Sequence, residues 1–225
     1  MYHPRSSAHG DKLCKLVIND LLDTCPSFQK AAQNGNIVYQ LNHVIDQGSP
    51  TQWNLDLVVG PPATQTQSLL NGELIASGEP REIWLAVDAK TVMTEHGKTR
   101  RNRQRDLNSL HDILHRKDSK TIVGGLVVVN IAERFKSPLR PEVTDHHNVK
   151  ALVRKTIELF KGLPRAKEGK AGLDALGVIV VSHSNLKGEK SELVRGDPAP
   201  ELGDSVHYDT FLSDICTASS HRVSI

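Results

Sequence analysis

The spacing of hydrophobic residues along the chain follows two different periods. In some segments apolar residues recur every three or four positions, as in amphipathic helices, and in others they alternate with polar residues or form short continuous runs, as in strands. The helical repeat predicts helices over residues 11–23, 100–116, 148–161 and 205–216. The other patterns predict strands over residues 37–45, 53–59, 81–93, 122–129 and 176–182. This order of elements predicts an α/β fold with a mixed central β-sheet flanked by helices.

Two polar segments interrupt this order. Residues 63–80 and 185–204 are rich in polar and turn-forming residues, and we expect both to be exposed, the first as a loop or a loose hairpin and the second as a loop. With 225 residues and 38% hydrophobic content, the chain is long enough for one good core and too short for two ordinary domains with linkers. The prediction is therefore a single domain over residues 1–225, with a structured core at about residues 11–184.

Composition limits the classes of protein to consider. No apolar run approaches the roughly 20 residues that a membrane helix needs, and Met1 to Gly10 is polar, so we expect an unexported, cytoplasmic protein without a membrane partner. The three cysteines, Cys14, Cys25 and Cys216, are odd in number and lack paired spacing, which argues against a disulfide framework or a zinc site and fits a reducing cytoplasm. The net charge is only +2, so a case for nucleic-acid binding must come from the distribution of charge.

Two predicted strands carry acids where an unpaired charge would cost stability. Asp56 lies inside the apolar strand of residues 53–59, and Asp88 lies near the end of the strand of residues 81–93. Side chains two residues apart in a strand point to one face, so Lys90 shares a face with Asp88. If the two strands are neighbours, two carboxylates and an ammonium group meet at one edge of the sheet. Carboxylate oxygens suit Mg²⁺, which keeps waters for a substrate phosphate.

This arrangement resembles the PD-(D/E)xK nuclease superfamily, to which most type II restriction endonucleases belong. Asp56 matches the first acid of the motif, Asp88 the second and Lys90 the lysine, while Leu55 stands where the motif has proline. The resemblance implies a restriction-endonuclease-like fold, with Asp56, Asp88 and the backbone carbonyl of Ala89 as ligands of Mg²⁺ or Mn²⁺. It also implies that Lys90 is the catalytic lysine.

Alternatives to this motif lie within the same sequence. Two other acid-x-Lys triplets, starting at Asp118 and Glu168, fall in a predicted turn and in a Gly-rich loop, so only the triplet that starts at Asp88 lies in a strand. The motif can also be structural, with Asp56 capping a turn and Asp88 and Lys90 forming a surface ion pair.

A cluster of positive charge opens the helix that follows the Asp88 strand. Its cations are Lys98, Arg100, Arg101, Arg103 and Arg105. Beside a site that cleaves phosphodiesters, such a cluster favours binding to the DNA backbone, with an affinity that depends on salt. The alternative for each arginine is a solvated helix face.

Other polar residues carry weaker signals. His111 and His115, four positions apart on one helix, have the spacing of metal ligands but are explained better as ordinary helical histidines. Residues 145–148 fit a histidine nuclease or a helix-capping turn, and residues 182–185 form a polar strand end that is a candidate for facing substrate. Asp20 and Asp23 are candidates for a further acid, although exposed helix positions explain them better.

These inferences together predict a Mg²⁺-dependent endodeoxyribonuclease that acts on double-stranded DNA. The simplest form is a type II restriction endonuclease working as a homodimer. A repair, recombination or mobile-element nuclease of the same superfamily is the first alternative. The second is a DNA-binding module without catalytic activity.

Overall fold

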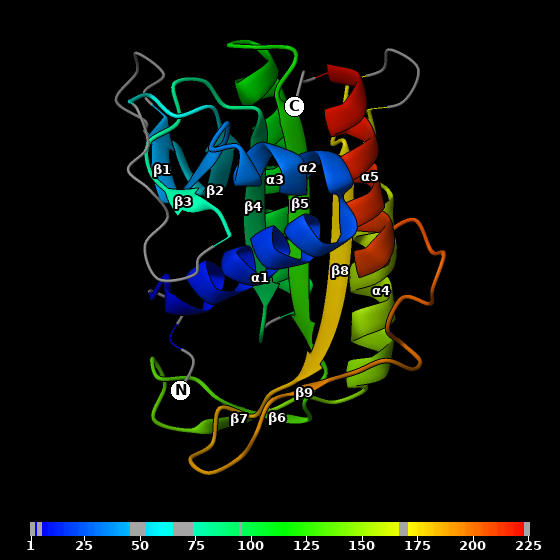
Figure 1. The fold of residues 1–225 in the computed structure, drawn as a ribbon. Helices are drawn as coiled ribbons and strands as arrows, with labels where there is room; N and C mark the ends of the chain where they lie inside the picture. Colours follow the sequence, from blue (N-terminus) through cyan, green and yellow to red (C-terminus); the bar gives the residue numbers. More distant parts are fainter. Residues whose placement is uncertain are drawn as a thin grey trace.

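The computed structural model describes residue 3 and residues 6–45, 53–64, 74–94, 96–166 and 171–222. In these parts of the chain a seven-stranded sheet forms the centre of the molecule, with helices on both faces (Figure 1). In spatial order the strands are β3 (Ala76–Ser77), β1 (Val38–Ile45), β2 (Trp53–Gly60), β4 (Leu85–Val92), β5 (Ile122–Asn130), β8 (Ala175–Ser182) and β9 (Glu192–Leu193). A separate hairpin pairs β6 (Arg134–Lys136) with β7 (Val143–Asp145).

Strand directions make the large sheet mixed. The central strands β4, β5 and β8 are parallel, whereas β1 and β4 each pair antiparallel with β2. Every residue of β5 is buried, which agrees with a strand covered on both faces. The predicted α/β fold with a mixed, helix-flanked sheet is confirmed, and its closer assignment to the restriction-endonuclease fold stays a prediction.

The helices form two layers. One face of the sheet is covered by α1 (Ala8–Thr24), α2 (Pro26–Gln33) and α5 (Tyr208–Arg222), and the other by α3 (His96–His115) and α4 (Val149–Lys161) (Figure 1). Each layer has its own hydrophobic core against the sheet. None of the helices in the described parts of the chain is long and apolar enough to cross a membrane.

Glycines bring α5 close to the central strands. Phe211 of α5 packs on Gly124 and Gly177, and a Cβ atom at either glycine would come within 3.2 Å of the phenylalanine side chain. The sheet therefore accepts a bulky aromatic residue only because these two positions have no side chain.

Three local elements differ from the predictions. Pro26 does not simply end the first helical segment, because it is the first residue of α2, where proline fits since the N–H it lacks would have no partner in the helix. The β6–β7 hairpin was not predicted, and β3 and β9 occupy parts of the segments expected to be loops. Residues 65–73 of the first predicted loop lie outside the described residues.

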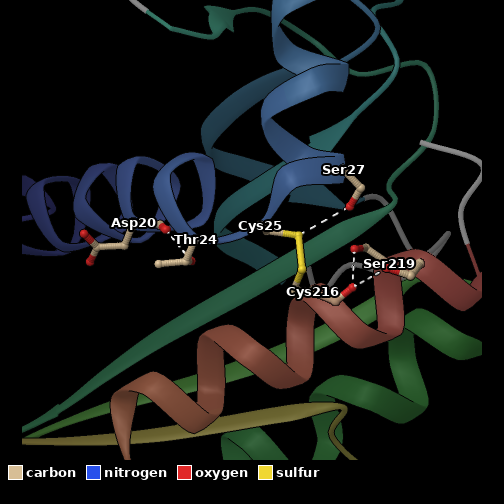
Figure 2. The surroundings of a disulfide bond; sticks show 7 residues. Asp20, Thr24, Cys25, Ser27, Cys216 and Ser219 are labelled. Carbon is tan, nitrogen blue, oxygen red and sulfur yellow. Dashed lines mark hydrogen bonds between the residues drawn. A yellow bond between two sulfur atoms is a disulfide. The ribbon is translucent and has the colours of Figure 1, made fainter.

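The expectation of unpaired cysteines is wrong. Cys25, between α1 and α2, and Cys216 of α5 form a disulfide with their Cα atoms 5.6 Å apart, across a sequence separation of 191 residues (Figure 2). Sequence spacing misses this pair because only the packing of α1 and α2 against α5 brings the two residues together. Cys14 is buried and free. The expectation of a reducing compartment therefore loses the support it took from the cysteines.

Candidate active site

Asp56 and Asp88 lie where β2 and β4 separate. The two strands pair antiparallel from Val59 opposite Leu85 to Leu57 opposite Val87, and the pairing ends there. The next pair in this register would be Asp56 and Asp88. The two strands are neighbours, which meets the condition set in the sequence analysis, and both acids stand at the point where the ladder opens.

The neighbouring β1–β2 ladder is interrupted at the same residue of β2. Asn42 of β1 has a left-handed backbone, with φ of 53°, and it interrupts the β1–β2 ladder opposite Asp56. The side-chain amide of Asn42 donates a hydrogen bond of 2.9 Å to Asp11 of α1. The alternation of β2 side chains between the two faces of the sheet also shifts at this point. Leu55 and Leu57, two residues apart, would share a face in a regular strand, but Leu57 packs into the core under α1 and Leu55 into the core under α3. Asp56 therefore occupies an irregular position in the strand.

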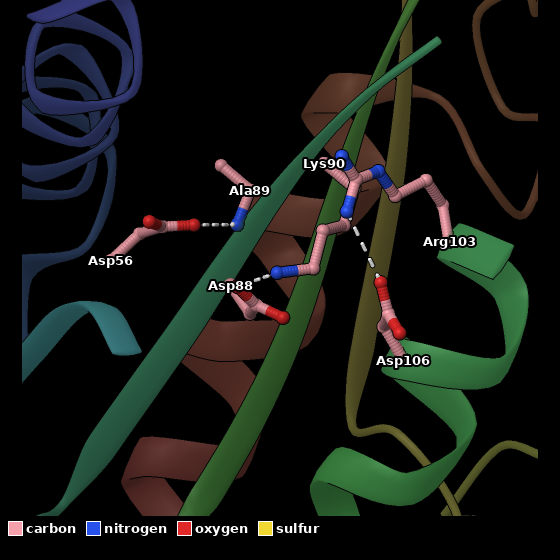
Figure 3. Close-up of polar contacts among 6 residues, drawn as sticks. All are labelled: Asp56, Asp88, Ala89, Lys90, Arg103 and Asp106. Atoms are coloured by element: carbon pink, nitrogen blue, oxygen red, sulfur yellow. Dashed lines mark hydrogen bonds and ion pairs between the residues drawn. The ribbon is translucent and has the colours of Figure 1, made fainter. Parts of the chain in front are cut away.

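The carboxylate of Asp56 replaces the missing ladder bond. Its Oδ2 accepts a hydrogen bond of 2.7 Å from the backbone N–H of Ala89 (Figure 3). This contact fastens the open end of β2 to β4 and holds the Asp56 carboxylate beside Asp88. It also shows that Asp56 is not a simple turn cap.

Asp88 is fully buried and only half satisfied. Its Oδ1 lies 2.6 Å from Nζ of Lys90, and its Oδ2 is a buried atom for which the described residues offer no hydrogen-bond partner. Burial raises the pKa of Asp88 to about 7, Lys90 opposes this rise, and the nearby carboxylate of Asp56 adds to it. The side chain of Lys90 is 17% exposed, so this contact is not a surface ion pair.

The basic cluster on α3 divides into two kinds of residue. Lys98, Arg101 and Arg105 are exposed, whereas Arg100 and Arg103 are half-buried. Arg103 extends from α3 toward Lys90, and its Nη1 lies 3.2 Å from Oδ2 of Asp106 (Figure 3). The predicted cluster therefore does not form one uniform surface.

A polar network that the sequence analysis missed connects the strand ends near this site. Nδ1 of His146 donates a hydrogen bond of 2.9 Å to the carbonyl of Ala132, and its Nε2 is hydrogen-bonded to the hydroxyl of Thr94 at 3.0 Å. Its ring lies edge-on to that of His96, whose Nε2 is 2.8 Å from the carbonyl of Asn130. The network links the segment after β5 to the start of α3, and no local sequence pattern indicates it because its members are distant in the chain.

The other sequence candidates lie elsewhere or serve packing. His111 and His115 are in ring contact, and the hydrogen bonds of His115 and Asp20 go to Thr121 and Tyr208. Asp118 accepts a hydrogen bond from the N–H of Lys120 in an exposed turn, as predicted. Residues 167–170, which include the third triplet, are outside the described residues. At the predicted capping turn, Asn148 precedes α4 with a left-handed backbone and no capping bond from its side chain.

The donor set at the strand opening fits Mg²⁺ better than zinc. Across the described ranges, no group of three or more His, Cys, Asp or Glu residues gathers in a metal-binding arrangement. Asp56 and Asp88 offer two carboxylates, which is the number Mg²⁺ commonly takes from protein while waters and phosphate complete its shell. Oδ2 of Asp88, which has no hydrogen-bond partner among the described residues, is available to such a cation.

In comparisons with known proteins, no family model, curated protein or solved structure matched the chain.

Proposed function

We propose that this chain is a Mg²⁺-dependent endonuclease that hydrolyses the backbone of double-stranded DNA, with Asp56, Asp88 and Lys90 as catalytic residues. One observation carries the proposal. Two carboxylates and a lysine converge where β2 leaves β4, and the fully buried Asp88 keeps one oxygen without a partner in the described chain.

The metal would be held by Asp56, Asp88 and the backbone carbonyl of Ala89. A bound Mg²⁺ supplies a Lewis acid for the phosphate and lowers the pKa of water. Lys90 pairs with Oδ1 of Asp88, but a buried Oδ2 without a partner in the described chain is costly, so a cation that joins the two acids would stabilise the protein. That cost supports a metal site over a purely structural role for Asp88.

Lys90 would act on the attacking water. Its Nζ is held against Asp88 at one end of the site, and its partly exposed side chain keeps the ammonium group within reach of solvent. In hydrolysis an oxygen–phosphorus bond forms from water and one backbone phosphorus–oxygen bond breaks, while the proton from water ends on the leaving oxygen. Lys90 orients the water and stabilises the negative charge that develops on it.

The exposed cations of α3 support DNA as the substrate. Lys98, Arg101 and Arg105 lie on the helix that directly follows β4, so they add positive charge beside the proposed site. Contacts to backbone phosphates bind DNA without reading its sequence. Cleavage at a specific sequence by a homodimer, as in type II restriction endonucleases, is the form of the proposal that rests on the motif resemblance alone.

A plasmid-nicking assay tests the proposal. Wild-type protein should convert supercoiled plasmid to nicked or linear forms in Mg²⁺ or Mn²⁺, and should bind DNA with little cleavage in Ca²⁺. Asp88→Asn and Lys90→Ala should each lower the rate by at least several tens-fold, where each tenfold equals about 1.4 kcal/mol of transition-state stabilisation.

Asp118→Asn and Lys120→Ala are matched controls, because they remove the same groups from a triplet in an exposed turn. Both controls should cleave at nearly the wild-type rate. Cleavage that persists in EDTA, or that Asp88→Asn leaves intact, would contradict the proposed function.

A further inference from the structure

Arg103, like Arg100, is half-buried, whereas the other three cations of the basic cluster are exposed. Lys98, Arg101 and Arg105 are exposed, but Arg103 is 40% exposed and extends toward Lys90 (Figure 3). Its Nε is a buried atom with no hydrogen-bond partner in the part of the chain that the structure describes. A buried N–H without an acceptor is destabilising, so this nitrogen needs a partner from outside the described chain.

Packing between α3 and the sheet fixes the position of Arg103. Leu107, one turn later on α3, packs on Gly125, which is the register partner of Asp88 in the β4–β5 ladder. Because the chain turns back between β4 and α3, earlier residues of α3 lie over later residues of β4. Arg103 therefore lies next to Lys90, on the side of the sheet that Asp88 and Lys90 share.

The contact with Asp106 leaves Arg103 available to a ligand. The 3.2 Å pair uses Nη1 only, and the two side chains are 40% and 38% exposed. An ion pair this exposed contributes little to stability, so a stronger acceptor can displace it. A phosphate offers two oxygens to the guanidinium fork and can satisfy Nε and a terminal nitrogen at once.

We propose that Arg103 binds the phosphate that is cleaved, while the exposed cations bind neighbouring phosphates of the same duplex. This assignment rests on the proposed nuclease function and deepens it, because it gives one arginine contact with the reacting group. Asp106 holds Arg103 in place until DNA arrives. A donor aimed at the charge that develops on the phosphate accelerates the reaction, whereas a donor to a distant phosphate contributes only to binding.

The test separates binding from the rate of the chemical step. Affinity for plasmid DNA is measured in Ca²⁺, and the rate of the first nick is measured in Mg²⁺ with protein at saturating excess. The variants are Arg103→Gln, Arg103→Lys, Arg105→Gln and Arg116→Gln. Arg116 is exposed and lies just beyond the C-terminal end of α3, far from the proposed site. Arg116→Gln is therefore the control that removes one positive charge away from that site.

Arg103→Gln should lower the saturated rate by about 100-fold, the usual loss for one donor to a developing charge, and should weaken binding no more than Arg105→Gln does. Arg105→Gln should act mainly on affinity. Arg103→Lys should recover only part of the rate, since lysine cannot bind with two parallel N–H groups. Arg116→Gln should match the wild type in both measurements.

The outcomes distinguish this inference from the proposed function. If the wild type cleaves but Arg103→Gln and Arg105→Gln have the same saturated rate, only the role of Arg103 is overturned. If the wild type does not cleave in Mg²⁺ or Mn²⁺, the nuclease function and the role of Arg103 both fail. Asp106→Asn should strengthen binding in Ca²⁺, and weaker binding would contradict the role given to Asp106.

Discussion

Replacing Asp88 by asparagine should stabilise the metal-free protein at neutral and alkaline pH. Burial raises the pKa of Asp88 from its ordinary value of 3.8 to about 7, so the folded protein holds this proton more tightly than the unfolded chain does. As the pH rises above 3.8, the unfolded chain ionises first, and the stability of the folded protein falls until the pH passes about 7.

The size of this effect follows from the shift in pKa. The pKa of Asp88 rises by about three units, and each unit corresponds to about 1.4 kcal/mol. The upper limit of the gain in stability at pH 8 is therefore about 4 kcal/mol. This limit already includes the opposing effect of Lys90, 2.6 Å from Oδ1 of Asp88, and the gain will be smaller because the asparagine amide is itself a buried polar group. We expect Asp88→Asn to gain about 1–3 kcal/mol, and for a chain of this length each kcal/mol raises Tm by roughly 2–4 °C.

The assay is thermal unfolding of both proteins in EDTA, from pH 4 to pH 8, followed by titration with Mg²⁺ at pH 8. The variant should unfold at a higher temperature at pH 8, and the difference should shrink toward pH 4. Mg²⁺ at 100 times its Kd should stabilise the wild type by about 2.7 kcal/mol and leave the variant almost unchanged. A variant that is less stable than the wild type by the same amount at every pH would refute the reasoning about Asp88.

Two further predictions concern the basic cluster and the disulfide. Changing Lys98, Arg101 and Arg105 together to glutamine should make the slope of log affinity against log salt concentration less steep. The slope should fall by up to about 0.9 for each DNA phosphate that the protein no longer neutralises, as measured by binding titrations at several salt concentrations. An unchanged slope would place these residues away from DNA. Cys216→Ser should lower the free energy of unfolding by about 2–4 kcal/mol, because the bond closes a loop with a sequence separation of 191 residues. Chemical denaturation without reductant measures this loss. A Cys25→Ser, Cys216→Ser double variant should lose little more than the single variant, and a single variant as stable as the wild type would argue against the bond.

Features set by short stretches of sequence could be predicted without the structure. The periodicity of apolar residues located α1, α3, α4 and the central strands to within a few residues, since helix and strand repeats bury one face each. The same period placed Asp88 and Lys90 on one face, and the structure brings them to 2.6 Å. Position in a strand also separated the triplet of Asp88 from the one in the turn at Asp118.

Features that depend on distant residues required the tertiary structure. The pairing of β2 with β4 and its end at Leu57 decide that Asp56 meets Asp88, and the left-handed Asn42 of a third strand interrupts the ladder opposite Asp56. The packing of α3 on the sheet, through Leu107, leaves Arg103 half-buried while Arg105, two residues later, is exposed.

The Cys25–Cys216 pair shows the same limit, because spacing along the chain carries no information about two residues joined by helix packing. Sequence periodicity therefore determines which face of an element each residue takes. Only the packing of one element on another determines which faces meet, because those contacts join residues that the local pattern cannot relate.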